Sequence, residues 1–412
     1  MEIAIGTNKI TGQDVVIDDA RHIYIEGMSG VGKSTALVNL FIRHIRQGHG
    51  GVFVDPHGDA ADQIARLIPK SRMRDFIWID PNAPFVPGLN IFAYRDPMER
   101  ELGVESFLTI MKALAGSAWG DETARILTNA ADAVVSRFER PTAVHVFRFL
   151  VDDRFREKML AQETQPLLQL FHRQYDEKLR SPEQMSRFSP PINKVGKLMR
   201  PAILPVIGQQ KSLDFLEIMN DSRIVVCRLS KGRLGEEISQ VLGSLVVSMV
   251  SISALKREKQ RRRSPFMMVV DEAGSFSHGG RFGSLLAESR KYGISLVLAS
   301  QSAAQLPFLA DVFANCPTQI AYQASGDDAM NFARNWGHET MAQAVVSLPR
   351  FECYVRTFIG DSPTVVRTIA QPAIERQGNE ANVTALIKQS LERWGTKRRE
   401  VEARIGRFLA SG

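Results

Sequence analysis

The sequence predicts an α/β fold in which a mostly parallel sheet is interrupted by an inserted all-helical domain. Short apolar runs that do not alternate with polar residues recur along the chain, as is typical of strands covered on both faces. Helical patterns separate several of these runs, which favours parallel pairing. Between Pro97 and Leu216 the pattern changes to successive helices broken by prolines. The predicted strands are His22–Glu26, Gly51–Val54, Phe76–Ile79, Ile224–Leu229, Phe266–Val270, Ile294–Ala299 and Gln319–Tyr322.

The chain of 412 residues exceeds one average domain, and we divide it into four parts. Residues 1–96 are predicted to form the first part of the sheet domain, residues 97–216 the inserted helical domain, and residues 217–374 the second part of the sheet domain. Residues 375–412 are predicted to be a linker followed by amphipathic helix between Ala385 and Leu409. Charges of mixed sign on this last segment favour docking on the protein or a partner over membrane binding.

The composition sets broad limits on function. The 52 basic and 45 acidic residues give a net charge of +7, which permits nucleic-acid binding without requiring it. Cys227, Cys316 and Cys353 lie far apart and lack metal-ligand spacing, so we expect buried thiols in a reducing compartment. We find no secretory leader and no apolar run approaching the roughly 18 residues that span a bilayer. A cytoplasmic protein without an integral membrane segment is expected.

The first chemical motif is a phosphate-binding loop. Gly27–Ser34 fits the pattern G-x-x-x-x-G-K-[ST] at every fixed position. The loop follows the predicted strand His22–Glu26 and precedes an apolar helical pattern over Thr35–Ile42. This strand, loop and helix order is the context that the motif requires, so the chain is predicted to bind a nucleoside triphosphate, namely ATP.

Each part of this loop has a chemical reason. Glycines let the backbone wrap around phosphate groups, and the helix N-terminus adds a partial positive charge. Lys33 is predicted to reach the β- and γ-phosphates, and the Ser34 hydroxyl to ligate Mg²⁺. The predicted nucleotide-binding residues are Gly27, Ser29, Gly30, Val31, Gly32, Lys33, Ser34 and Thr35.

The second motif is an apolar strand, Phe266–Val270, that ends in Asp271 and Glu272. Asp271 is predicted to hold Mg²⁺ beside Ser34, and Glu272 to orient or deprotonate the attacking water. A solvated turn is the alternative for two carboxylates at a strand end. An adjacent glutamate suits a water nucleophile, so hydrolysis is favoured over phosphorylation of a small molecule.

Two further residues flank the strand Ile294–Ala299. Gln301 follows it and is predicted to sense the γ-phosphate or the attacking water. Arg290 precedes it, away from its own nucleotide, and could act as an arginine finger on a neighbouring subunit. Taken alone, Gln301 also fits a strand cap and Arg290 a surface ion pair.

Two other features each leave two interpretations open. Asp55 and His57 either order the nucleotide site or only shape a Pro-Gly turn. The basic run Lys256–Arg263 is either a solvated helix end or a loop that contacts DNA.

Together these motifs resemble the HerA/FtsK superfamily of DNA-pumping ATPases, and within it the type IV secretion coupling proteins of the TraG/TraD kind. The resemblance implies a RecA-like P-loop ATPase, a hexameric ring with nucleotide between subunits, and a DNA channel. It also implies an arginine finger at Arg290 and a γ-phosphate sensor at Gln301. The strings that carry it are Gly27–Ser34, Val54–Asp59, Val270–Glu272, Ser289–Gly293, Ala299–Gln301 and Leu229–Gly232.

The resemblance departs from the family at the N-terminus. Only the polar stretch Met1–Arg21 precedes the first predicted strand, where membrane-anchored coupling proteins carry transmembrane helices. Met1–Asp19 is likewise too short for the β-barrel of HerA proteins. We therefore expect a motor without its own anchor, which could still associate peripherally with a membrane secretion complex.

The sequence thus predicts an ATP-hydrolysing DNA translocase of conjugative or related transfer, with secretion or relaxosome proteins as partners. A protein-handling secretion or assembly ATPase of the same superfamily is one alternative. A nucleotide-gated scaffold with slow turnover is the other. Stimulation of turnover by DNA would separate the first hypothesis from both.

Overall fold

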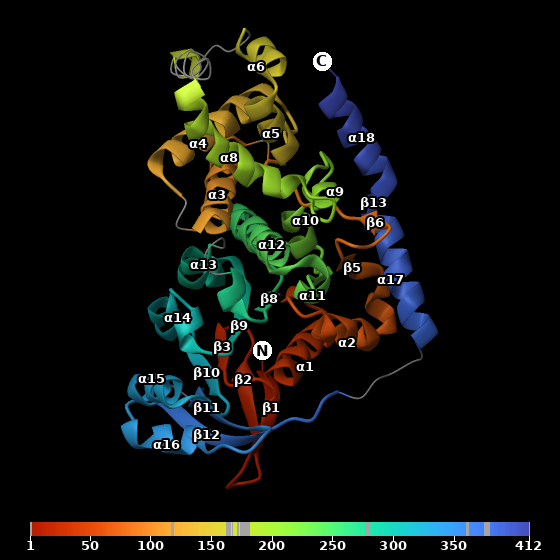
Figure 1. Cartoon of the computed structure of the whole chain (residues 1–412). Coiled ribbons are helices and arrows are strands. Elements are labelled where there is room, and N and C mark those ends of the chain that lie inside the picture. The colour runs from red at the N-terminus through yellow and green to blue at the C-terminus, as the bar shows by residue number, and fades with distance from the viewer. Residues whose placement is uncertain are drawn as a thin grey trace.

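A computed structural model describes residues 2–94, 96–116, 119–161, 166, 168–170, 173, 182–276, 281–359, 362–374 and 380–411. The strands and their flanking helices occupy the lower part of the molecule, and a group of helices lies above them (Figure 1). A C-terminal arm of two helices runs along one side from the sheet to the upper helices.

In the described residues, eleven strands form one mixed sheet in the order β2-β1-β12-β11-β10-β3-β9-β8-β4-β7-β5. The segment from β10 to β5 is parallel throughout, and the remaining strands pair antiparallel. The parallel strands are β3 (Ile23–Glu26), β4 (Gly50–Asp55), β5 (Phe76–Ile79), β7 (Ile224–Arg228), β8 (Phe266–Val270), β9 (Ile294–Ser300) and β10 (Thr318–Ala321).

All seven predicted strands are present, and the mostly parallel α/β sheet is confirmed. The sequence did not reveal four antiparallel strands, which extend the sheet beyond β10. In β2 and in Glu352–Thr357 of β11, buried residues alternate with more exposed ones, as expected for strands with one wet face, whereas β1 and β12 contain mostly partly exposed residues. In the part of the chain that the structure describes, none of the four has the buried apolar run that marks the parallel strands. These strands are β1 (Glu2–Asn8), β2 (Asp14–Asp18), β11 (Glu352–Ile359) and β12 (Ser362–Ala370).

Helices cover both faces of the parallel segment, which gives three layers. In β4, the side chains of Val52 and Val54 join one hydrophobic core, while Phe53 joins the core on the opposite face. The Phe53 face is covered by α1 (Lys33–Arg46), α2 (Asp59–Leu67) and α17 (Glu380–Trp394). The opposite face is covered by α12 (Glu236–Lys256) and α13 (Phe282–Glu288).

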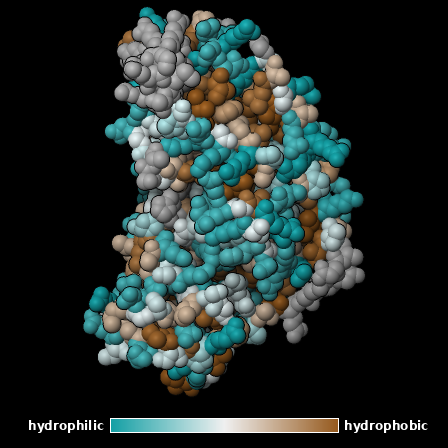
Figure 2. Space-filling model, in the orientation of Figure 1, coloured by the Kyte–Doolittle hydropathy of each residue, from teal (hydrophilic) through white to brown (hydrophobic). Residues whose placement is uncertain are grey.

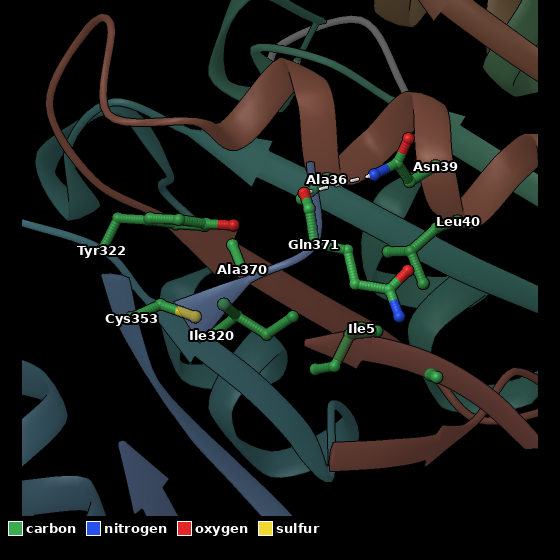
Figure 3. A pocket seen from close by; sticks show the side chains of 10 residues that line it. Ile5, Ala36, Asn39, Leu40, Ile320, Tyr322, Cys353, Ala370 and Gln371 are labelled. Carbon is green, nitrogen blue, oxygen red and sulfur yellow. Dashed lines mark hydrogen bonds between the residues drawn. The ribbon is translucent and has the colours of Figure 1, made fainter. Parts of the chain in front are cut away.

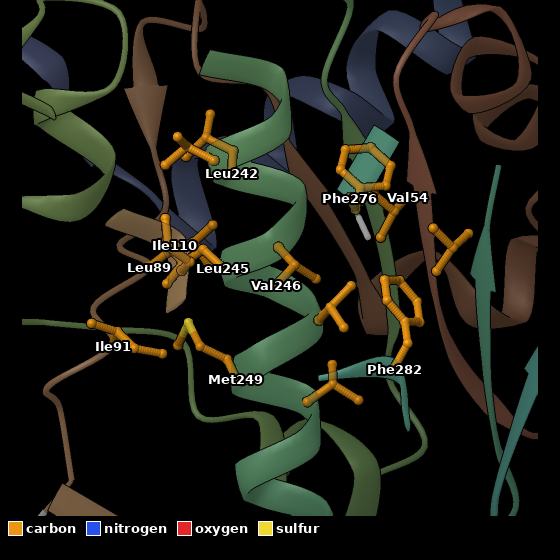
Figure 4. Close-up of a cluster of buried hydrophobic side chains, with 14 of the residues drawn as sticks. Val54, Leu89, Ile91, Ile110, Leu242, Leu245, Val246, Met249, Phe276 and Phe282 are labelled. Atoms are coloured by element: carbon orange, nitrogen blue, oxygen red, sulfur yellow. The ribbon is translucent and has the colours of Figure 1, made fainter. Parts of the chain in front are cut away.

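Helix α12 lies at the centre of the molecule, between the sheet and the upper helices (Figure 4). On one side Val246 packs with Val54, Phe276 and Phe282, and on the other Met249 lies near Leu89, Ile91 and Ile110. Almost every residue from Ile238 to Ala254 is buried. A helix that is apolar all round is a core helix rather than an amphipathic surface helix.

The expectation that no apolar run approaches the length of a membrane span is wrong. The helical stretch Glu236–Lys259 has 24 residues, and an 18-residue window within it has a mean hydropathy of 1.8, so by length and composition it could cross a membrane. However, 89% of its most apolar window is buried inside the protein. Its apolarity is explained by contacts on both sides of α12.

From Pro97 to Leu213 the described residues contain helices and no strand. Side chains of Asp96 and Asp152 accept hydrogen bonds from the first turns of α3 and α6, and so fix where these helices begin. The boundaries proposed for an inserted domain stay a prediction. The helices are α3 (Pro97–Ala115), α4 (Asp121–Arg137), α5 (Ala143–Val151), α6 (Asp153–Leu160), α8 (Pro182–Gly196) and α9 (Leu204–Ile207), followed by α10 (Phe215–Asn220).

The C-terminal arm docks on both parts of the protein. Ser390 of α17 accepts a hydrogen bond from the Trp78 amide (2.8 Å) and donates to the Phe76 carbonyl (3.0 Å), so it satisfies backbone groups of the edge strand β5. Helix α18 (Arg398–Ala410) follows, and Arg148 of α5 donates to the carbonyl of Phe408 at its end. Docking on the protein is as predicted, whereas residues 375–379 of the predicted linker lie outside the described residues.

Shorter elements complete the chain. The strand β6 (Phe85–Val86) pairs with β13 (Thr396–Lys397), which joins α17 to α18. The other helices are α11 (Lys231–Leu234), α14 (Leu309–Asn315), α15 (Gly326–Trp336) and α16 (Ala342–Val346).

Candidate functional site

The register of three parallel strands places the predicted motifs at one edge of the sheet. Strand β9 pairs with β3 on one side, where Glu26 is opposite Ser300, and with β8 on the other, where Val270 is opposite Leu298. The residues that follow these strands therefore leave the sheet side by side. Carboxyl ends of parallel strands are where α/β proteins bind ligands.

The phosphate loop follows β3 and leads into α1, as predicted. Gly27, Gly30 and Gly32 have φ angles of 155°, 78° and 120°, which L-residues with a side chain rarely adopt. A Cβ atom on Gly27 would lie 2.6 Å from the Cβ of Tyr322, so this glycine also permits close approach of the next strand. The motif glycines are thus required by backbone geometry.

Lys33 is the first residue of α1 and is almost fully buried. Its ammonium donates hydrogen bonds to the carbonyls of Gly27 and Met28, so it lies across the loop. Burial lowers the pKa of Lys33, and the nearby carboxylates Asp271, Glu272 and Glu26 oppose that shift. A buried cation facing three acids is placed to bind anionic oxygens at the mouth of the loop.

Asp271 is buried directly after β8, and its amide donates to the Val54 carbonyl at 3.1 Å. Burial, together with the charges of Asp55 and Glu272, raises the pKa of Asp271 to about 6. A crowded, desolvated carboxylate of this kind fits a divalent cation, which would offset the repulsion. Ser34 is exposed on α1, as a hydroxyl that reaches a Mg²⁺ outside the loop requires.

Glu272 is engaged through both of its carboxylate oxygens. Oε1 accepts hydrogen bonds from Gln301 and from His57 Nε2 (2.8 Å), and Oε2 accepts from Lys231 Nζ at 2.9 Å. The hydrogen bond from His57 contributes most to lowering the pKa of Glu272 to about 2, and Lys231 adds to the effect. The φ angle of 48° is unusual for glutamate and turns its side chain toward these partners.

Asp55 and His57 differ in the groups that they contact. Asp55 is fully buried, and its carboxylate accepts hydrogen bonds from the amides of His57 (2.8 Å) and Ala61 (2.8 Å). Asp55 therefore shapes the turn that begins α2. His57 reaches the candidate site instead, and its hydrogen bond to Glu272 raises the pKa of His57.

Two residues that the motifs did not assign to the site, Lys231 and Arg350, also lie beside it. Lys231 of α11 donates hydrogen bonds to Glu272 and Ser275. In the sequence, Lys231 is marked only by the string Leu229–Gly232, which is part of the family resemblance. Arg350 donates to the Gly30 carbonyl from Nε (3.1 Å) and Nη2 (2.9 Å). Only a three-dimensional structure could bring Arg350, which is 320 residues from Gly30 in sequence, onto the loop.

Gln301 and Arg290 lie at opposite ends of β9, as predicted. The Gln301 side chain donates to Glu272, which brings it into the candidate site. Arg290 is exposed beyond the other end of the strand and lies near His22, whose pKa it helps to lower. No contact in the described residues tests the roles of Gln301 as a sensor or Arg290 as an arginine finger.

A small pocket lies behind the phosphate-loop helix (Figure 3). It is lined by residues of β1, α1 and β10–β12, among them Ile5, Leu40, Ile320 and Cys353. None of its lining residues is charged, so its chemistry does not suit a triphosphate.

Comparisons with known proteins agree with this arrangement. Residues 265–348 match the family model described as the TraM recognition site of TraD and TraG. The bacterial conjugative coupling protein TrwB aligns with a TM-score of 0.66 and 16% identity, over 90% of each chain. The fold of the chain is thus similar to that of a conjugative coupling protein, and its residues 265–348 are similar to a segment of TraD and TraG. Its fold is that of RecA-like P-loop ATPases, as predicted.

Two further structures align over most of the chain. VirB4 of Thermoanaerobacter pseudethanolicus has a TM-score of 0.67 and 16% identity, over 90% of this chain and 96% of VirB4. TrwB in complex with ADP and Mg²⁺ has a TM-score of 0.63 and 16% identity, over 87% of each chain. No curated protein sequence matches the chain.

A buried acid lies beneath the phosphate loop. Glu26, the last residue of β3, accepts a hydrogen bond from the Tyr24 hydroxyl at Oε2, and its Oε1 is buried without a hydrogen-bond partner among the described residues. Burial raises the pKa of Glu26 to about 8; Asp328 adds to this effect, while Tyr24 and Lys33 oppose it. Glu26 is therefore protonated in the folded protein at neutral pH.

This predicts a pH-dependent stability that Glu26→Gln removes. A folded-state pKa of about 8, above the ordinary value of 4.5, gives a contribution that is complete below pH 4.5 and is lost as the pH rises toward 8. We expect Glu26→Gln to become more stabilising from pH 5 to pH 8, by up to about 1.4 kcal/mol per pH unit. Urea unfolding at several pH values measures the effect.

Glu392→Gln on the exposed face of α17 is the matched control, and it should leave the pH dependence unchanged. If the free energies of unfolding of Glu26→Gln and the wild type differed by the same amount at all pH values, Glu26 would be ionised in the folded state.

Proposed function

We propose that this protein is a Mg²⁺-dependent ATPase that moves DNA in conjugative or related transfer. The proposal rests on one observation. The chain shares its fold with a conjugative coupling protein, and four predicted site residues meet at one edge of its sheet, namely Lys33, Asp271, Glu272 and Gln301. Solved TrwB structures contain a non-hydrolysable ATP analogue and ADP with Mg²⁺, which supports the choice of ligand.

Hydrolysis would use these residues in distinct roles. Lys33 would exchange the carbonyls of Gly27 and Met28 for phosphate oxygens, while Ser34 and Asp271 would hold Mg²⁺. When bound, Mg²⁺ supplies positive charge that stabilises the transferring phosphoryl group. Glu272 would orient the attacking water, but a carboxylate with a pKa of about 2 accepts protons poorly. Its contacts with His57, Lys231 and Gln301 must therefore loosen before it acts as a base.

A ring assembly would complete the site. Arg290 is exposed at the sheet edge opposite the phosphate loop, so it cannot serve its own nucleotide site. In a head-to-tail ring, this edge of one subunit would face the loop of the next. We therefore propose a hexamer in which Arg290 acts across the subunit interface, as arginine fingers do.

The DNA contact is proposed at the basic loop before β8. Arg261 and Arg262 are exposed there. Arg263 instead donates to the carbonyls of Arg257 (2.7 Å) and Glu258 (2.8 Å), so it caps the end of the preceding helix. Arg263 thus fits the interpretation of a helix end, and we propose that Arg261 and Arg262 contact DNA. A relaxosome or secretion protein is proposed to bind within 265–348, which matches the TraM recognition model.

The first test separates binding from hydrolysis. We expect Lys33→Ala to abolish ATP binding or turnover, because its ammonium contacts phosphate in the ground state. We expect Glu272→Gln to keep ATP binding and lose turnover, because the carboxylate acts on water. ATP affinity and steady-state ATPase rates measure both, and wild-type turnover by Glu272→Gln would remove Glu272 from the catalytic role.

The second test asks whether Arg290 acts on a neighbour. Arg290→Ala should bind ATP nearly normally and lose hydrolysis by up to about 10³- to 10⁵-fold. Its neighbour Lys291, also exposed, gives the matched control Lys291→Ala, which should retain activity. Mixing Arg290→Ala with Lys33→Ala subunits should restore some ATPase activity, because each supplies what the other lacks. Mixed rings that stay inactive would exclude action in trans.

The third test concerns DNA. We expect DNA to stimulate ATPase activity irrespective of sequence, and added salt to reduce the stimulation steeply, because phosphate contacts release condensed counterions. Replacing Arg261 and Arg262 with glutamate should lower both the stimulation and its salt dependence. The same replacement at Arg399 and Arg404, exposed on α18, changes net charge equally and should have little effect.

Turnover that ignores single- and double-stranded DNA at low salt, in an assembled ring, would exclude the DNA motor. Fast turnover under those conditions would favour a protein-handling ATPase. Tight ATP binding with very slow turnover would favour a nucleotide-gated scaffold.

A further inference from the structure

The segment between α16 and β11 lies against the phosphate loop. Its backbone is fixed there by a hydrogen bond from the Phe351 amide to the Val31 carbonyl (3.0 Å). The Arg350 guanidinium adds the two hydrogen bonds to the Gly30 carbonyl. Because β11 runs antiparallel to β10 and β10 runs parallel to β3, the start of β11 lies at the same sheet edge as the loop.

Phe351 combines two features that are uncommon for a bulky aromatic residue. It is 49% exposed, although it lies beside a rigid glycine loop. Its φ angle is 63°, in the left-handed region that phenylalanine rarely adopts. Hydrogen bonds from its amide to Val31 and from the Ala370 amide to its carbonyl (2.8 Å) hold it in place. Strain that persists under such constraint is concentrated at ligand sites.

The ring of Phe351 lies directly beside the helix end of the loop. A Cβ atom on Gly32 would lie 3.0 Å from Phe351 Cδ1 and 3.4 Å from Tyr322 Cε1. The Arg350 guanidinium is 5.9 Å from the centre of the Phe351 ring. An exposed aromatic face and a cation therefore stand next to the predicted phosphate-binding backbone. Figure 2 shows one face of the molecule, on which hydrophobic side chains form several separate patches among hydrophilic ones.

We propose that Phe351 and Arg350 form the nucleoside-binding part of the nucleotide site. The nucleobase stacks on the exposed face of Phe351, and Arg350 contributes positive charge beside the base or the adjoining phosphate. This inference rests on the proposed ATPase function and assigns a subsite that the phosphate-loop motif does not specify.

The proposal has a consequence for specificity. Stacking tolerates different bases, because every base presents a π face. Adenine and guanine nucleotides should therefore depend on Phe351 to a similar extent. The base then adds affinity and positions the nucleotide, while the difference in affinity between adenine and guanine nucleotides is small.

The test compares a nucleotide with its phosphate chain alone. We expect Phe351→Ala to weaken binding of ATP, ADP and GTP by about 5- to 150-fold, the range for loss of one base–aromatic stack. Binding of inorganic tripolyphosphate should remain unchanged. Phe351→Trp should restore nucleotide binding, and Phe351→Leu, which keeps apolar bulk without a π face, should not. Isothermal calorimetry with Mg²⁺ measures all these affinities.

Two controls separate this inference from the proposed function. Lys33→Ala should weaken ATP and tripolyphosphate alike, so a wild-type protein that binds neither would contradict the nucleotide site itself. Ile10→Ala removes an even more exposed apolar side chain (89%) and should leave all affinities unchanged. Equal nucleotide affinities in Phe351→Ala and wild type, or an altered oligomeric state without altered affinity, would overturn the inference and indicate a subunit contact at Phe351.

Discussion

The parallel pairing of β3, β9 and β8 is the constraint on which the rest of the candidate site depends. Because Glu26 lies opposite Ser300 and Val270 opposite Leu298, three segments leave the sheet at one level. A slip of one residue in this register would turn each strand's side chains to the other face. Both faces are packed against helices. After such a slip, each face of the strand would bury side chains that now pack on the opposite face. The hydrophobic core thereby fixes the position of the groups at the candidate site.

The same core links the site to the rest of the chain. Helix α12 packs on the sheet with one side and on the upper helices with the other (Figure 4). Its first turn is tied to the upper helices through Glu237, which binds Lys197 and Arg200. Helix α11, which carries Lys231, precedes α12 directly. A displacement of the upper helices is thus connected through packed elements to a cation that holds Glu272. That connection is spatial, and coupling would require α11 to have two arrangements.

The sequence predicted the parallel strands and the edge at which the motifs meet, because unbroken apolar runs and the glycine loop are local signals. It did not predict β1, β2, β11 and β12, whose mixture of buried and partly exposed residues carries a weaker signal. Nor did it place Lys231, Arg350 or Phe351 beside the predicted motifs, because their positions depend on pairing between distant segments. Asp55 and His57 show the same limit. Their string is local, but only the fold separates the residue that shapes the turn from the one that contacts Glu272.

The charges at this edge explain how a highly acidic site can remain folded. Asp55, Asp271, Glu272 and Glu26 are gathered there, and desolvation opposes ionisation of buried carboxylates. The protein offsets this cost of desolvation in a different way at each of these acids. Glu272 is paired with Lys231 and His57, Asp55 accepts backbone amides, and Glu26 is protonated. Asp271 has a pKa raised to about 6 by burial and by the like charges of Asp55 and Glu272, so a bound cation would stabilise its ionised form. The acid predicted to bind the metal is therefore one whose charge is disfavoured by its surroundings until a cation is present.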